Sequence, residues 1–114
     1  MAESIHRPWG YYTVLTEGDG FLVKTITVKP EQKLSVQSHN FRKEHWIILK
    51  GYADVLKGSK NYVLKEGECI DINEKEIHSL SNNGNTDLII LEVQRGSVLS
   101  EDDIIRYKDI YGRV

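Results

Sequence analysis

Short runs rich in β-branched and aromatic residues recur along this chain roughly every eight to twelve residues, and turn signals separate them. The turns include the segments "EGDG", "KGSK", "KEGE" and "NNGN". This spacing predicts an all-β sandwich or barrel. The clearest strands are expected at residues 11–16, 21–28, 33–39, 45–50, 52–57, 61–65, 69–72, 78–82 and 88–94.

The tail of the chain departs from this pattern. Ser100 is followed by Glu101, Asp102 and Asp103, which resembles a helix N-cap with acidic residues in the first turn. We therefore expect a short C-terminal helix after the last strand.

Length and charge limit the classes of protein that this chain can represent. With 114 residues and 39% hydrophobic content, it is long enough for one domain, which we place at residues 1–114. Fifteen basic against seventeen acidic residues give a net charge of -2, which favours neither nucleic acid nor an anionic membrane as a partner. No apolar run has the length of a signal peptide or a membrane span, and the single cysteine, Cys69, cannot form an internal disulfide. These features predict a soluble, cytoplasmic protein.

Two of the expected strands, at residues 45–50 and 88–94, are apolar on both faces. Such strands are typical of sheets that are covered on both sides. In so short a chain the second covering layer is expected to come from another subunit, so we predict a homodimer.

Alternation along the strands brings several potential metal ligands together. Gln37 and His39 share one face of a strand and can converge on one ion. In the next strand, Glu44 shares its face with apolar residues of the expected core, whereas His45 takes the opposite face. A buried carboxylate needs a cation or another positive partner. With His78 from a later strand added, this set of nitrogen and oxygen ligands suits zinc, manganese, iron, cobalt or nickel.

The spacing of these residues resembles the paired motifs of the cupin superfamily. The first motif has the form G-x5-H-x-H-x4-E-x6-G and is matched by Gln37, His39, Glu44 and Gly51, with Gln37 in place of the first histidine. The second has the form G-x5-P-x-G-x2-H-x3-N and is matched by Gly67, His78 and Asn82. Where the motifs have turn glycines and a proline, this chain has Glu31, Lys75 and Asn73, so we expect the loops to differ while the ligands are retained.

Longer stretches resemble one family within the cupins. The segments "RPWGYY", "LSVQSHNFRKEHWIILKG" and "SEDDIIRYKDIYGR" are similar to the C-terminal domain of type II mannose-6-phosphate isomerases, which are often fused to a mannose-1-phosphate guanylyltransferase. The resemblance implies a double-stranded β-helix, or jelly-roll barrel, with one divalent ion, zinc before the other metals, held by Gln37, His39, Glu44 and His78. It also implies interconversion of mannose 6-phosphate and fructose 6-phosphate. We find no glycine-rich nucleotide-binding loop, so this chain is expected as a standalone domain that does not make GDP-mannose by itself.

Two further residues are candidates for a catalytic role in such an isomerisation, which requires a base and stabilisation of an oxyanion. Lys24 falls on the predicted core face of its strand, where burial would lower its pKa or leave it to hold an anionic intermediate. Alternatively, its ammonium reaches solvent while its stem lies along the barrel. Glu92 interrupts an apolar strand and is either a second carboxylate in the cavity or the partner of Lys24 in a structural ion pair.

Arginine is the expected ligand for a sugar phosphate, because the acidic start of the tail would repel phosphate. Arg42 lies beside the ligand turn, and Arg106 and Arg113 lie in the segment that resembles the family's tail. We predict that the tail packs at the barrel mouth, with Arg106 the stronger candidate and Arg113 the weaker.

Three functions remain open from the sequence. The first is a metal-dependent sugar-phosphate isomerase. The second is a non-catalytic cupin that binds a sugar or sugar nucleotide and serves as partner to a separate enzyme. The third is another metal-dependent cupin enzyme, such as an oxygenase.

Overall fold

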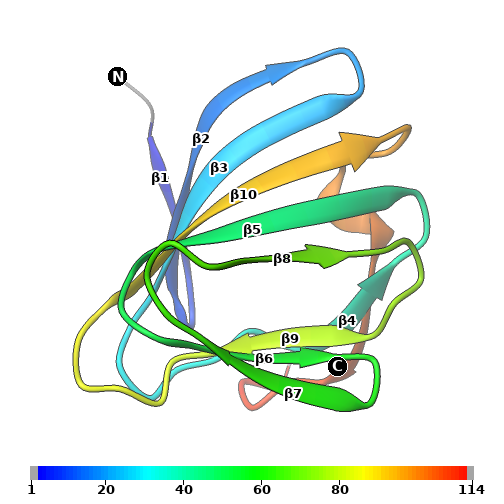
Figure 1. Ribbon diagram of the computed structural model, residues 1–114. Helices are drawn as coiled ribbons and strands as arrows, with labels where there is room; N and C mark the ends of the chain where they lie inside the picture. The colour runs from blue at the N-terminus through cyan, green and yellow to red at the C-terminus, as the bar shows by residue number, and fades with distance from the viewer. Residues whose placement is uncertain (1–2, 113–114) are drawn as a thin grey trace.

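Two antiparallel sheets face each other across the core of the computed structural model, which describes residues 3–112 (Figure 1). The larger sheet has the strand order β1-β2-β3-β10-β5-β8. Its strands are β1 (Ser4–Arg7), β2 (Gly10–Gly18), β3 (Phe21–Val28), β10 (Leu88–Gly96), β5 (Arg42–Lys50) and β8 (Cys69–Ile72). The smaller sheet has the order β11-β4-β9-β6-β7. Its strands are β11 (Ile104–Lys108), β4 (Val36–His39), β9 (His78–Ser81), β6 (Ala53–Lys57) and β7 (Lys60–Leu64).

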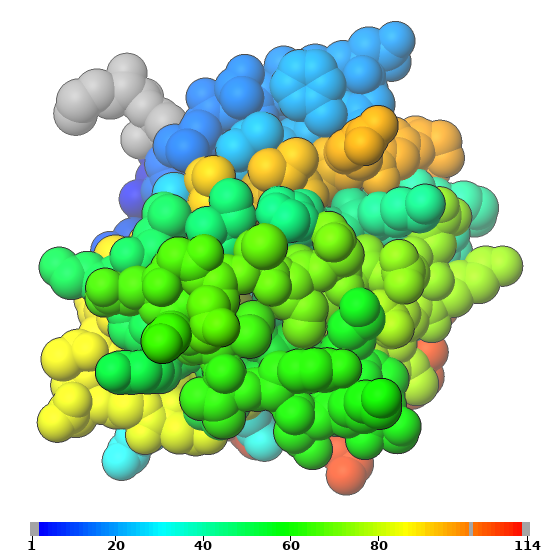
Figure 2. All heavy atoms as spheres, in the orientation of Figure 1, coloured from blue at the N-terminus to red at the C-terminus, as the bar shows by residue number. Residues whose placement is uncertain are grey.

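From β3 onward the chain passes from one sheet to the other at every connection except the hairpin between β6 and β7. This winding is that of a jelly-roll barrel. The prediction of an all-β barrel is therefore confirmed. In the space-filling view, the segments from β5 to β8 cover the front of the barrel (Figure 2).

The core lies between the two sheets because each strand buries alternate side chains. Along β5 the buried residues are Arg42, Glu44, Trp46 and Ile48, whereas the residues between them are partly or fully exposed. Trp9, in the segment between β1 and β2, is buried in the same core. The apolar core consists of Trp9, Tyr12, Ile26, Val28, Trp46, Ile48, Ala53, Val55, Ile72, Leu80, Leu88 and Ile90. Polar residues on the inward face of β5 therefore project into the interior of the barrel.

The tail does not form the predicted C-terminal helix. Ser100 does act as a cap, since its hydroxyl accepts a hydrogen bond from Asp102 N at 3.0 Å, but only a single 3-10 turn, η1 (Glu101–Asp103), follows. The chain then continues as β11, which pairs with β4 and adds an edge strand to the smaller sheet. Pairing with β4 extends the backbone at Ile104 and Ile105, whose branched side chains favour a strand over a helix.

Two loops next to the core keep a left-handed backbone without glycine. Glu31 and Lys75, at the positions where the cupin motifs have glycine, have φ angles of 64° and 65°. This backbone directs Glu31 N to Asn82 O at 2.8 Å and Lys75 N to His39 O at 2.6 Å. At these two residues the backbone has the left-handed conformation that glycine favours, and whether the loops differ elsewhere stays a prediction.

Replacing Lys75 with glycine is expected to stabilise the fold. A side chain in the left-handed region costs roughly 1–2 kcal/mol, and the added freedom of glycine in the unfolded chain offsets part of that gain. We expect Lys75→Gly to raise the free energy of unfolding by about 0.5–1 kcal/mol in urea denaturation. Lys60→Gly, at an exposed site in β7, is the matched control and should lose stability instead. A loss in both variants would contradict the assignment of strain to Lys75.

The outer face of the larger sheet is only partly covered. Ile47, Leu91 and Val93 are half-buried there, and Leu49 is exposed. This is where the second layer expected from the sequence would lie, and the homodimer stays a prediction. Among residues 3–112 no helix is long and apolar enough to cross a membrane.

Candidate functional site

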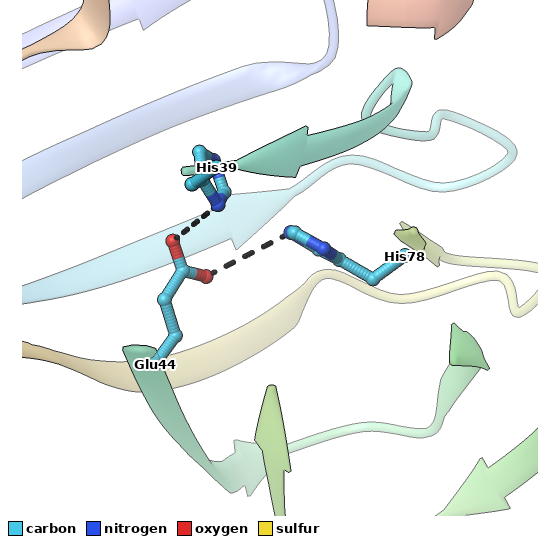
Figure 3. A group of neighbouring side chains, drawn as sticks. All are labelled: His39, Glu44 and His78. Atoms are coloured by element: carbon cyan, nitrogen blue, oxygen red, sulfur yellow. Dashed lines mark ion pairs between the residues drawn. The ribbon is translucent and has the colours of Figure 1, made fainter. Parts of the chain in front are cut away.

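Three buried side chains meet between the two sheets. His39 comes from the end of β4, His78 from the start of β9, and Glu44 reaches toward both rings from β5 in the opposite sheet (Figure 3). Glu44 Oε2 lies 3.4 Å from His39 Nδ1, and Glu44 Oε1 lies 4.0 Å from His78 Nε2. Potential ligand atoms on all three residues lie within 4.8 Å of one another, a grouping that could hold a metal ion.

The two faces of β5 are divided as strand alternation predicts. Glu44 is 3% exposed inside the barrel, whereas His45 lies on the outer face. There His45 Nδ1 lies 2.6 Å from Asp71 Oδ1 in β8. His45 therefore takes no part in the interior cluster. Gln37, the remaining predicted ligand, is buried and lines the same cavity as the two histidines.

Both interior histidines are neutral at physiological pH. Burial, with Arg42 and His78 nearby, lowers the pKa of His39 to about 3. Burial also lowers the pKa of His78, although the hydrogen bond to the Glu76 carbonyl opposes this shift. His78 Nδ1 donates to Glu76 O at 2.8 Å, which leaves Nε2 unprotonated and directed toward Glu44.

Arg42 lies inside the cluster rather than at its rim. It is 4% exposed, and its Nε donates to Glu44 Oε2 at 3.0 Å. Its Nη2 lies 2.9 Å from His39 Nε2, and its Nη1 donates to Ser100 O at 3.4 Å. The sequence placed Arg42 beside the ligand turn as a phosphate ligand, but its guanidinium contacts the candidate metal ligands themselves.

Lys24 and Glu92 form a buried ion pair beside this cluster. Lys24 Nζ lies 3.4 Å from Glu92 Oε2 and 4.2 Å from the centre of the Tyr12 ring. Lys24 is 8% exposed and Glu92 is 4% exposed. This geometry is the ion pair that the sequence offered as the alternative to a catalytic role, and it leaves the Lys24 ammonium inside the barrel.

Trp46, on the same strand face as Glu44, links the two carboxyl groups of Glu44 and Glu92. Trp46 Nε1 donates to Glu44 Oε1 at 2.9 Å and to Glu92 Oε1 at 3.0 Å. Burial, and next the neighbouring Glu92, raises the pKa of Glu44 well above its ordinary value. For Glu92, burial alone would raise the pKa, but Lys24 and the hydrogen bond with Glu44 are the main causes that lower it to about 2. The position of Trp46 two residues after Glu44, on the same strand face, was the signal for this contact.

The cavity opens beside β1 and β11. Most of its lining residues are buried, and the partly exposed ones are Arg7, Leu34, Ile104 and Arg106. The Nε atom of Arg106 is buried and has no hydrogen-bond partner within residues 3–112. The tail thus lies at the mouth of the barrel, as predicted, and brings Arg106 to it. Arg113 lies outside the described residues.

The cavity has a volume of about 50 Å³. Sites for small molecules usually measure roughly 300–1,000 Å³, whereas a water molecule takes up about 30 Å³ in the liquid. The interior therefore has room for a few waters, and a sugar phosphate could place only a small part of itself there.

The sequence as a whole matches a family model. The model is described as "Mannose-6-phosphate isomerase C-terminal" and covers residues 1–109. The chain belongs to this family. This mannose-6-phosphate isomerase C-terminal domain is 46% identical over 110 residues to mannose-1-phosphate guanylyltransferase RfbM of Salmonella typhimurium, covering 96% of this chain and 23% of that protein. It is 47% identical over 109 residues to the alginate biosynthesis protein AlgA of Pseudomonas aeruginosa, with the same coverage of 96% and 23%.

Solved structures place this family domain in the cupin fold. The capsular polysaccharide assembling protein CapF of Staphylococcus aureus superposes with a TM-score of 0.83 at 16% identity, over 96% of this chain and 35% of that one. A double-stranded β-helix protein of Klebsiella pneumoniae superposes with a TM-score of 0.75 at 18% identity, over 94% of this chain and 86% of that one. These similarities confirm the predicted double-stranded β-helix.

The comparisons correct the predicted activity. The sequence resemblance implied a mannose-6-phosphate isomerase, but relatives such as RfbM and ManC of Salmonella typhimurium are named as guanylyltransferases. Residues 1–114 span less than a quarter of the length of these relatives. The predicted isomerase activity rested on the family resemblance, whereas RfbM and ManC are named for guanylyl transfer. Lys24 and Glu92 were predicted as catalytic residues for the isomerisation, so their predicted catalytic role no longer has support.

Proposed function

We propose that this domain is a non-catalytic cupin that binds a phosphorylated sugar or a sugar nucleotide and works together with a guanylyltransferase. The observation that carries the proposal is the buried Arg106 Nε, which has no hydrogen-bond partner within residues 3–112 at the mouth of the barrel. Buried donors in native proteins are almost always paired, so a donor left without a protein partner beside a cavity is a candidate ligand contact.

The charges at the mouth fit an anion. Arg7 and Arg106 are its two partly exposed charged residues, and both are positive. Arg7 is held in place by the Tyr12 side chain, whose ring centre lies 5.4 Å from the guanidinium carbon. Arginine recognises phosphate through charge-assisted hydrogen bonds. The phosphate group would therefore contact these arginines at the opening, while the sugar or nucleotide remains outside the small cavity.

The names of the relatives supply the class of ligand. RfbM and ManC are named as mannose-1-phosphate guanylyltransferases, so the ligands proposed for this domain are mannose 1-phosphate and GDP-mannose. The binding proposal does not include the single divalent ion that the sequence predicted at Gln37, His39, Glu44 and His78, with zinc before manganese, iron, cobalt or nickel. The proposed phosphate contacts at Arg7 and Arg106 do not require it.

Calorimetric titration tests the binding proposal. Mannose 1-phosphate and GDP-mannose should bind, and mannose, which lacks the phosphate, should not. Removing one charged hydrogen-bond donor costs roughly 1.5–3 kcal/mol, so Arg106→Met should weaken binding by about tenfold or more. Arg95→Met removes an exposed arginine that does not line the cavity and should leave the affinity unchanged. Equal affinity of wild type and Arg106→Met, or equal binding of mannose, would refute the proposal.

A further inference from the structure

The Arg42 guanidinium contacts two of the three side chains that could hold a metal ion. Its Nε donates to Glu44 Oε2 at 3.0 Å, and its Nη2 lies 2.9 Å from His39 Nε2. Its third nitrogen, Nη1, donates to Ser100 O at 3.4 Å. Arg42 is 4% exposed and each of its guanidinium nitrogens contacts a polar atom, so this side chain is fixed in the barrel interior.

These contacts determine which nitrogen of His39 carries the proton. A guanidinium has only donors, so His39 Nε2 must accept the hydrogen bond from Arg42. In a neutral imidazole the proton then lies on Nδ1, which is 3.4 Å from Glu44 Oε2. A metal ion needs an imidazole nitrogen with a free lone pair. While Arg42 is in place, neither nitrogen of His39 has a free lone pair. Of the two imidazoles in the cluster, only His78, through Nε2, could still bind a metal ion.

The charges around the cluster also favour Arg42 over a divalent ion as its cation. Two buried carboxyl groups, Glu44 and Glu92, are already faced by two cationic side chains, Arg42 and Lys24. Addition of a divalent ion would place two more positive charges in a site from which water is largely excluded. The donor set is also weaker than the cupin motif provides, because Gln37 offers a neutral amide where the motif has an imidazole.

We infer that Arg42 takes the place of the metal ion in this cupin, so that its guanidinium is the resident cation of the His39, Glu44 and His78 cluster. The donor residues of a cupin metal site are present, but as arranged here they do not fit a divalent ion. The cluster then serves as a metal-free, hydrogen-bonded link between the two sheets, connecting His39 of β4 with Arg42 and Glu44 of β5.

Metal binding to the purified chain tests this inference. The protein is dialysed against a chelator, titrated with Zn²⁺ or Mn²⁺ alone, and its metal content is measured by mass spectrometry. Wild type should hold no stoichiometric metal after gel filtration. Arg42→Ala frees His39 Nε2 and Glu44 Oε2, and should bind Zn²⁺ at least tenfold more tightly than wild type. Arg42→Ala combined with His78→Ala should lose that gain, and Arg95→Ala should behave as wild type. One tightly bound Zn²⁺ per wild-type chain, lost in His39→Ala, would overturn the inference.

A second measurement does not depend on the folding of any variant. The nitrogen chemical shifts of the wild-type histidines distinguish the two neutral tautomers, and His39 should carry its proton on Nδ1. A proton on Nε2 would overturn the hydrogen bond from Arg42 and with it the inference. Both measurements use protein without sugar ligand. Failure of the sugar-phosphate titration would therefore leave the inference about Arg42 intact. A wild-type protein that contains metal and binds mannose 1-phosphate would refute the inference about Arg42 but not the proposed binding function.

Discussion

Lys24→Met is expected to destabilise the barrel by about 3–5 kcal/mol, which is the usual cost of removing one partner of a buried ion pair. The reason is that the buried carboxylate of Glu92 would remain without its positive partner. Glu92 is 4% exposed, and Lys24 is the leading cause among those that lower its pKa to about 2, so it is ionised at neutral pH. Methionine keeps most of the volume of the lysine stem and supplies no charge. Urea denaturation at pH 7, followed by circular dichroism, measures the loss.

Two companion variants separate the lost charge from lost packing. Lys24→Met combined with Glu92→Gln removes both charges and should recover a large part of the stability, since replacing a whole buried pair is often nearly neutral. Lys29→Met breaks the exposed pair of Lys29 and Asp87, which are 3.2 Å apart, and should cost less than about 1 kcal/mol. If Lys24→Met cost no more than Lys29→Met, the Lys24 ammonium would have to reach solvent, as the alternative from the sequence supposed.

Strand alternation predicted the inside of this barrel well because each sheet buries one face. It placed Lys24 and Glu44 inside and His45 outside, and the structure has all three there. The same rule also applies to Arg42, which is two residues before Glu44 on β5 and therefore points inward. Arg42 was instead predicted to bind the phosphate of a substrate, because it lies next to the turn between two strands. The burial of a positive charge beside two histidines depends on contacts across both sheets, which alternation within one strand cannot reveal.

Local sequence signals were weaker guides where a tertiary contact decided the conformation. The left-handed backbone of Glu31 and Lys75 was not visible from side chains that rarely adopt it. At the tail, the capping signal of Ser100 was correct for one turn only, since pairing of β11 with β4 ends the helix at once. The sequence did not predict the activity for another reason: the spacing of the motif residues identifies the fold, and one fold carries many different functions.

The carboxylate of Asp103 is expected to be the second large contributor to stability. It is 8% exposed, and its two oxygens accept hydrogen bonds from Asn40 N at 3.1 Å and Phe41 N at 3.0 Å. These two amides form the turn between His39 and Arg42, so the tail holds the backbone that positions both residues of the cluster. Hydrogen bonds to a charged group contribute roughly 1.5–3 kcal/mol each, and unpaired buried amides add their own cost.

Asp103→Ala should therefore lower the free energy of unfolding by about 3 kcal/mol in urea denaturation. Asp103→Asn should also destabilise, because an amide has one oxygen and one donor group facing two backbone donors. Asp102→Ala changes the exposed neighbour on the same turn and should stay within about 0.5 kcal/mol of wild type. Equal stability of Asp103→Ala and Asp102→Ala would mean that the tail is not a structural support of the β4–β5 turn. In that case Arg42 would have to be positioned by its own contacts with Glu44, His39 and Ser100.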